Sequence, residues 1–232
     1  MVYVAAGPRR IPAGPGVYDP GAKRSEPVER RTAIMMAVAM LGAIAVPSAP
    51  ALAALADPAA AQVDAFDAAL LAAMKAGKAA GVQGRYRSLE PAVTRAFDIP
   101  TMIRFAVGPT WSTIPAAQQQ SLTEAFQRLT VASYAHNFSG YSGESFTVDP
   151  NVVTRGPDKV VQTKIVSPGS APVAISYRMR QSGGAWKIID VFYNGSISQL
   201  TTRRADFSAS LAHGGAPALI AHLNQLADKE LK

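Results

Sequence analysis

Residues 134–146, YAHNFSGYSGESF, place a histidine near a serine between glycines. Such a serine resembles the nucleophile elbow G-x-S-x-G, where a neighbouring histidine activates the hydroxyl for attack on a carbonyl. The resemblance fails twice. Glu144 stands where the elbow needs glycine, and the elbow joins a strand to a helix, whereas this segment follows a helical pattern and precedes a strand pattern. We therefore expect a helix end with glycines in left-handed conformation.

Asp190 and His136 are the other candidates for acid–base chemistry. Asp190 lies within an expected strand, on the same face as Trp186 and Ile188, where burial could make it a general base. No acid partner is evident, so we expect it to accept hydrogen bonds from neighbouring backbone or an arginine. His136 falls on an apolar helical stripe and is expected in the core or beside a cavity.

Motifs for metals and cofactors are absent from the sequence. The three histidines, His136, His213 and His222, do not share a ligand spacing, and H-E-x-x-H does not occur. The chain has no cysteine, which excludes disulfides, thiolate catalysis and cysteine-bound metals. Glycine-rich phosphate loops are also missing. We predict no catalytic residue, no metal and no cofactor.

Arg204 is the least ordinary charged residue. It falls near an apolar line formed by Ile197, Leu200, Phe207 and Leu211. Its stem could cover apolar surface while the guanidinium reaches water. It could equally be a cation at a cavity mouth or docking face, in contact with a head group or a partner.

Charge gives no support for nucleic-acid binding. The formal net charge is +7, but the first 56 residues carry six basic and three acidic groups, which leaves +4 for the rest. No positive stripe with interleaved aromatic residues occurs. We expect no nucleic-acid partner.

Residues 1–56 have the organisation of a signal peptide with a long n-region. Arg30-Arg31 precede an uncharged apolar stretch over 33–46, followed by A-x-A segments at 51–53 and 54–56. The stretch is shorter than the roughly 20 residues of a membrane span. A twin-arginine signal and an uncleaved anchor are the alternatives. Either way, residues 57–232 are expected to form a single domain outside the cytoplasm.

Hydrophobic periodicity places helices before and after a run of strands. Expected strands occupy 146–153, 161–165, 173–180 and 185–193, with turn signals between them. Expected helices occupy a segment from Asp57-Pro58 to about residue 77, then 88–97, 98–106, 116–138, 197–211 and 219–226. This order predicts an α+β fold with a four-stranded antiparallel curved sheet wrapped by several helices.

The helix at 116–138 indicates what the fold is for. Its second half is apolar nearly all round, so it needs cover on both sides: two layers, or one layer and a ligand cavity. An apolar pocket between sheet and helices would suit a lipid tail, because burial contributes about 0.8 kcal/mol per methylene. The same residues would suit an ordinary core. The expected lining is Phe105, Trp111, Phe126, Leu129, Tyr134, Phe138, Ile165, Ile175, Tyr177, Trp186 and Ile188.

Three segments resemble the toluene-tolerance family of periplasmic lipid-binding proteins. They read FDIPTMIRFAVGPTW, QQQSLTEAFQRLTVASYAHNFSGYSGESF and WKIIDVFYNGSISQLTTRRADF. Their wording is most similar to the hopanoid-biosynthesis-associated branch. One departure occurs: the family's Asn-Tyr-Arg-x-x-Phe reads Thr202-Arg203-Arg204-Ala205-Asp206-Phe207 here, which concerns the helix expected to dock a partner.

The resemblance implies a periplasmic carrier and no enzymatic activity. It implies that 57–232 is a lipid-binding domain that shuttles hopanoids or related lipids between inner and outer membranes, with transient membrane contact and hand-off to an inner-membrane lipid transporter complex. The alternatives are a phospholipid carrier of an ABC-type transport system, a small cavity enzyme using Asp190 and His136, and a membrane-anchored scaffold.

Overall fold

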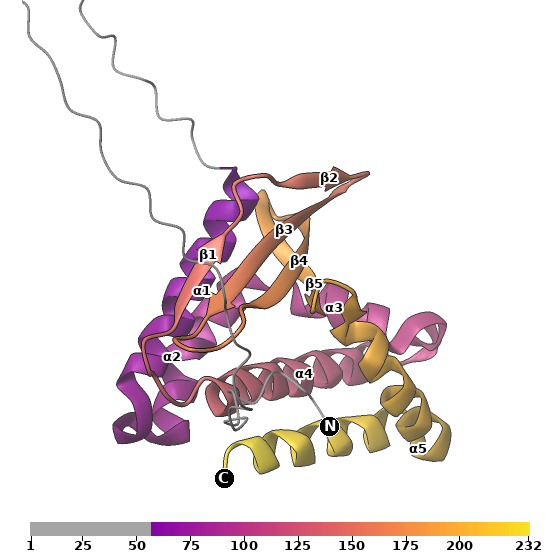
Figure 1. Ribbon diagram of the computed structural model, residues 1–232. Helices are drawn as coiled ribbons and strands as arrows, with labels where there is room; N and C mark the ends of the chain where they lie inside the picture. The colour runs from indigo at the N-terminus through magenta and orange to yellow at the C-terminus, as the bar shows by residue number, and fades with distance from the viewer. Residues whose placement is uncertain (1–56) are drawn as a thin grey trace, which may run out of the picture. The chain divides into compact units, whose positions relative to one another are not determined.

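The computed structural model describes residues 57–232. The signal peptide expected over 1–56 lies outside the described residues. Within 57–232, helices precede and follow a single antiparallel sheet (Figure 1), which confirms the α+β class. The helices are α1 (Pro58–Ala76), α2 (Gly81–Ala96), α3 (Ile99–Val107), α4 (Ala116–Asn137) and α5 (Gln199–Glu230), with 3-10 turns η1 (Gly77–Ala80) and η2 (Gly108–Thr113).

Local signals account for the helix boundaries. Asp57 caps α1 by accepting from the Ala59 amide, and Asp98 caps α3 by accepting from the Thr101 amide. Gly77 and Gly108 follow the last residues of these helices with positive φ, which glycine adopts without strain. The break expected at 214–215 is present within α5, where both glycines leave helical geometry and divide it into two arms.

The sheet has six strands, so the prediction of four was wrong. The strands are β1 (Ser145–Val148), β2 (Val153–Arg155), β3 (Asp158–Val166), β4 (Val173–Ser182), β5 (Ala185–Tyr193) and β6 (Ile197–Ser198). Their order is β1-β3-β4-β5-β6, and β2 also pairs with β3. The expected first strand is two strands because the chain leaves the ladder near Pro150, which cannot donate to it. Ile197, expected to begin a helix, pairs with Tyr193 instead.

Helix α4 lies between the sheet side of the domain and the second arm of α5 (Figure 1). Residues 129–135 of α4 are all buried, as its apolar second half predicted. Arg128 of α4 donates to Asp228 of α5 at 2.6 Å, and Leu219 and Leu223 of that arm are buried. On its other side, α4 faces an aromatic cluster in which Phe66 makes edge contacts with Phe97, Tyr134 and Tyr177.

Candidate functional site

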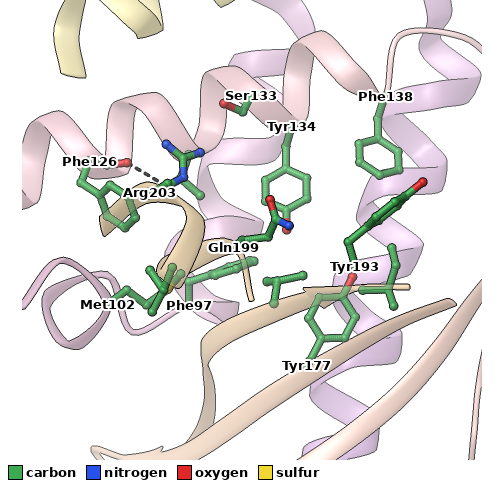
Figure 2. A pocket seen from close by; sticks show the side chains of 14 residues that line it. Phe97, Met102, Phe126, Ser133, Tyr134, Phe138, Tyr177, Tyr193, Gln199 and Arg203 are labelled. Atoms are coloured by element: carbon green, nitrogen blue, oxygen red, sulfur yellow. Dashed lines mark hydrogen bonds between the residues drawn. The ribbon is translucent and has the colours of Figure 1, made fainter. Parts of the chain in front are cut away.

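An apolar cavity lies between α4, strands β4 and β5, and the first turns of α5 (Figure 2). The space that a water-sized sphere can enter measures about 70 Å³. Small-molecule pockets typically measure about 300–1,000 Å³, so this cavity is narrow. It is lined by Phe97, Met102, Phe126, Thr130, Ser133, Tyr134, Phe138, Ile175, Tyr177, Val191, Tyr193, Gln199, Leu200 and Arg203.

The wall on α4 follows from helical spacing. Phe126, Thr130, Tyr134 and Phe138 are four residues apart, which places them on one face of the helix. The Thr130 hydroxyl donates to the Phe126 carbonyl at 2.8 Å (Figure 2), so it does not present an unsatisfied donor to the cavity. This face is therefore apolar apart from Ser133 and the hydroxyl of Tyr134.

The opposite wall follows from strand alternation. Ile175 and Tyr177 of β4 pair with Tyr193 and Val191 of β5 in the ladder. Residues two apart on a strand share a face, so these four side chains lie together and line the cavity. Figure 2 shows Tyr177 and Tyr193 reaching from the strands toward α4. Two adjacent strands and one helix thus supply most of the cavity surface.

Polar groups gather where α5 closes the cavity. Arg203 and Gln199 reach in from α5, and Ser133 lies on the facing side of α4 (Figure 2). The guanidinium of Arg203 lies 5.6 Å from the ring centroid of Phe126. Burial lowers the pKa of Arg203 to about 10, so it is a cation at pH 7. Burial also raises the pKa of Tyr134, which stays neutral.

A buried carboxyl lies behind Tyr177. Asp67 of α1 is 2% exposed and accepts a hydrogen bond from the Tyr177 hydroxyl at 3.5 Å. Its other oxygen has no partner among the described residues. Burial raises the pKa of Asp67 to about 7, so a neutral carboxylic acid is well populated near physiological pH. The sequence patterns did not single out this residue.

Five of the eleven expected lining residues meet at this cavity. They are Phe126, Tyr134, Phe138, Ile175 and Tyr177. The other six lie elsewhere: Leu129 and Ile188 are buried in the core, Trp111, Ile165 and Trp186 are half-buried against the core, and Phe105 is 36% exposed on the surface.

Arg204 lies outside the cavity, in a second hollow that we call the outer groove. The outer groove is lined by Arg104, Phe105, Gly108, Arg178, Ile189, Asp190, Leu200, Thr201 and Arg204. The Arg204 guanidinium packs directly on Gly108, where any Cβ would overlap with it. Successive residues of a helix point about 100° apart, so Arg203 faces the cavity while Arg204 faces the groove.

Asp190 also faces the outer groove, and the prediction that it shares a face with Ile188 was wrong. A β-bulge shifts the register between Arg178–Asp190 and Met179–Ile188. Because a bulge adds one residue to a strand, it reverses the alternation beyond it. Asp190 accepts hydrogen bonds from the Ser198 hydroxyl at 2.6 Å and from the amides of Val191 and Leu200 at 2.8 and 3.3 Å. It therefore anchors the start of α5. The amide donors agree with the expectation from the sequence that Asp190 accepts hydrogen bonds from neighbouring backbone.

Burial raises the pKa of Asp190, and its hydrogen bonds from Ser198, Leu200 and Val191 oppose that rise. All of these partners are donors that stabilise the charged form. The carboxylate is thus committed to structural contacts and does not face the cavity. It is poorly placed to act as a base toward a ligand bound there.

His136 is exposed, so its expected place in the core or beside a cavity was wrong. Its imidazole Nδ1 lies 3.1 Å from the Glu230 carbonyl and 3.6 Å from the Glu230 carboxylate. His136 is two residues from both Tyr134 and Phe138, so its side chain points to the opposite side of α4, beside the exposed end of α5. His136 and Asp190 contact different partners, Glu230 and Ser198, and do not form a catalytic pair.

The corner containing Ser142 joins α4 to β1. This is the helix-to-strand order that the sequence indicated. Ser142 is exposed, and its amide donates to the carboxylate of Glu144. Within residues 57–232 no group of three histidine or acidic side chains could hold a metal ion. None of the described helices has the length and apolarity to cross a membrane.

A family model described as MlaC protein matches residues 64–225. The chain belongs to the MlaC family. The match covers α2, α3, α4, the whole sheet and α5 as far as residue 225, and therefore every residue that lines the cavity. It also confirms the resemblance to the toluene-tolerance lipid-binding family that the sequence motifs indicated.

Two individual relatives agree with this assignment. Over 78 residues, 34% of this chain and 36% of the relative, the chain is 30% identical to the toluene tolerance protein ttg2D of Pseudomonas putida. The match thus spans about a third of that protein. A phospholipid-binding protein from Ralstonia solanacearum, solved in complex with a phospholipid, has a TM-score of 0.66 at 23% identity, covering 76% of this chain and 100% of that chain. This likeness shows that the two share a fold.

Arg203, Ser133 and Gln199 were missed by the sequence analysis. One signal was available for Arg203, since it replaces the tyrosine of the family's Asn-Tyr-Arg pattern. It is also three residues after Leu200 and four before Phe207, which are spacings on one helical face. Ser133 gave no signal, because a serine within a helix is usually satisfied by its own backbone.

Proposed function

We propose that this chain is a lipid-binding carrier that holds an apolar chain in the cavity between α4 and the sheet. The observation that carries this proposal is the placement of the cavity, whose walls are apolar side chains of α4, β4 and β5. Membership of the MlaC family and the shared fold with a phospholipid-binding protein support it. Burial of methylenes would supply the binding energy, at about 0.8 kcal/mol each.

A lipid tail needs more room than about 70 Å³. The walls must therefore move apart when a ligand enters. The first arm of α5 is the element that can move most readily, because it ends at the glycine break at 214–215 and closes the cavity with Gln199, Leu200 and Arg203. We infer that displacement of this arm admits the tail.

The finer assignment is a periplasmic carrier of hopanoids or related lipids between the inner and outer membranes. The residues at 107–111, 137–146 and 196–209 resemble the hopanoid-associated branch and favour a hopanoid ligand, whereas the phospholipid-bound relative favours a phospholipid. Hand-off to an inner-membrane lipid transporter is part of this proposal. We place membrane contact at the outer groove, where Arg104 and Arg204 have no acidic partner within residues 57–232.

Solvent extraction followed by mass spectrometry tests the carrier function. The purified protein, taken directly and after incubation with membranes containing both lipid classes, should release hopanoid or phospholipid in stoichiometric amount. Absence of lipid in both samples would refute the carrier function. Recovery of phospholipid without hopanoid would reject the hopanoid assignment and leave the carrier intact.

A cavity-filling variant tests the location. Val191→Phe places a larger side chain in the cavity wall, and we expect lipid uptake to fall at least about tenfold because overpacking leaves no space for a tail. Val153→Phe is the matched control, since Val153 is 41% exposed on β2 and far from the lining. Equal uptake by the two variants would exclude this cavity as the binding site.

The cavity-enzyme alternative has little geometric support. Asp190 faces the outer groove and His136 faces solvent. We expect His136→Ala to leave lipid uptake unchanged, together with any turnover of added lipid esters. Turnover that depends on His136 would revive the alternative.

A further inference from the structure

We propose that the cavity takes a ligand whose anionic oxygen group enters it and pairs with Arg203, while the ligand's apolar chain lies between α4 and the sheet. This inference rests on the proposed lipid-binding function and adds the chemical class of the ligand. The class is a single-chain amphiphile in which a phosphate or carboxylate is joined directly to an alkyl chain.

Arg203 is a cation without a partner of its own. Within residues 57–232 it has no carboxylate oxygen within 4.0 Å and donates no side-chain hydrogen bond. Among the residues that the structure describes, its one specific side-chain contact is with the ring of Phe126. An aromatic face attracts a guanidinium but leaves its N–H groups free to donate in the plane of the group.

Other partly buried arginines of this chain are satisfied. Within residues 57–232, Arg85 donates to the carbonyls of Ala135 and Gly77 at 2.8 and 2.9 Å, Arg128 pairs with Asp228, and Arg180 pairs with Asp158. A half-buried cation without such partners is costly. The exception at Arg203 therefore indicates that its partner comes from outside the chain.

The charges around Arg203 do not replace that partner. Glu230 and Asp206 are the nearest acids, and they act on it only at longer range than an ion pair. No acidic side chain lines the cavity. An ammonium group would therefore find no counter-charge there, whereas an anion would.

Ser133 is an independent observation that points the same way. It is 2% exposed and lines the cavity, and its hydroxyl has no hydrogen-bond partner in the described part of the chain. Gln199 lines the cavity one turn before Arg203 on α5, and its amide donates one hydrogen bond to the Ile197 carbonyl at 3.4 Å, which leaves its second N–H for a ligand. A guanidinium, a hydroxyl and an amide together can donate several hydrogen bonds, which matches the acceptor-rich oxygens of a phosphate or carboxylate.

Calorimetry with matched twelve-carbon ligands tests the inference on the purified protein. Dodecyl phosphate and dodecanoate should bind about tenfold more tightly than dodecanol, as expected for a charge-assisted hydrogen bond. Inorganic phosphate should bind much more weakly than dodecyl phosphate, because it lacks the chain. Arg203→Gln should abolish the preference for the anionic ligands and leave dodecanol binding unchanged.

The controls separate charge from general damage. Arg87→Gln removes an exposed cation of α2 that lines neither the cavity nor the outer groove. It should keep the anionic preference. Arg203→Lys keeps the positive charge but lacks the planar guanidinium, so it should keep part of the preference for anionic ligands. This variant still tests the inference if Arg203→Gln folds poorly.

Equal affinity of the wild type for dodecanoate and dodecanol would overturn the inference and leave the carrier function standing. Persistence of the anionic preference in Arg203→Gln would overturn it as well. Inorganic phosphate that binds as tightly as dodecyl phosphate would indicate a free-anion site instead of a head-group site. Failure of all three chain-bearing ligands to bind would remove the proposed function itself.

Discussion

The cavity and the outer groove lie on either side of the first turns of α5 and treat charge in opposite ways. The cavity is lined mainly by apolar side chains, with Arg203, Ser133 and Gln199 among them and no acidic residue. Behind it lies Asp67, whose pKa burial raises to about 7. The groove contains three arginines and Asp190. Near it, hydrogen bonds from Arg180 and Arg178 outweigh the effect of burial and lower the pKa of Asp158.

This difference shows that burial alone does not decide whether a carboxyl group is protonated or charged. Asp67 and Asp158 are 2% and 1% exposed. Asp67 has only a tyrosine hydroxyl beside it, so desolvation raises its pKa. Asp158 has two arginines, so its charged form is the stable one. On the cavity side, burial raises the pKa of Asp67 and Arg203 has no acidic partner within residues 57–232, whereas beside the groove Asp158 is paired with two arginines.

The largest expected effect concerns Asp67. Its pKa lies at about 7 in the folded chain against an ordinary value of 3.8, so between these pH values the folded chain holds a proton that the unfolded chain lacks. The free energy of unfolding should therefore fall as pH rises from about 4 to about 7, by up to about 4 kcal/mol. Asp67→Asn should flatten this dependence, measured by urea denaturation at pH 5 and pH 8.

Glu124→Gln is the control for Asp67, because Glu124 is an exposed acid on α4 and is not among the groups that shift the pKa of Asp67. It should leave the pH dependence as in the wild type. If Asp67→Asn and the wild type lose the same stability between pH 5 and pH 8, the cavity side does not hold a neutral carboxyl.

The next effect concerns the anchor of α5. Asp190→Ala removes the acceptor for the Ser198 hydroxyl and for the amides of Val191 and Leu200. We expect a loss of about 3 kcal/mol in stability, since buried donors are left without partners. Thermal unfolding with Asp190→Asn alongside measures this, and the amide should recover part of the loss. A loss below about 0.5 kcal/mol would mean that Asp190 does not hold the wall between cavity and groove.

Gly108→Ala tests the packing of the groove. The substitution forces a residue at φ 75° and overlaps with the Arg204 guanidinium, and we expect a cost of about 2 kcal/mol. Gly77→Ala is the matched control, because Gly77 also follows a helix, its φ and ψ of 57° and −148° resemble the 75° and −144° of Gly108, and nothing lies within 4 Å of the added Cβ. The excess cost at Gly108 over Gly77 reports the overlap with Arg204. Adding Arg204→Ala to Gly108→Ala should remove this excess.

The smallest effect concerns Arg204 at a membrane surface. A surface arginine near anionic lipid contributes about 1 kcal/mol, so Arg204→Gln should weaken sedimentation with phosphatidylglycerol vesicles about fivefold. Phosphatidylcholine vesicles should bind the two proteins equally weakly. Unchanged binding to the anionic vesicles would show that the groove faces something other than a membrane.

The sequence determined the classes of element and the main axis of the site. Period-two alternation at 173–180 and the helical stripe ending at Phe138 correctly indicated a sheet facing a covered helix, because these periods follow from backbone geometry. The three motif segments indicated the family, which the family match confirms. Five expected lining residues, among them Tyr134 and Tyr177, meet at the cavity because helical and strand periodicity place them on the facing sides of α4 and the sheet.

Only the tertiary structure decided which polar groups face that cavity. Arg203 and Arg204 both flank one apolar stripe, and the docking of α5 selects which of them turns inward. The bulge in β5 turned Asp190 outward, and a bulge is set by strand pairing. Asp67 and Ser133 belong to ordinary helical patterns, and their isolation from other polar groups arises only when distant segments pack around them. Periodicity specifies the face of an element, whereas the partner that covers the face is fixed by contacts across the whole chain.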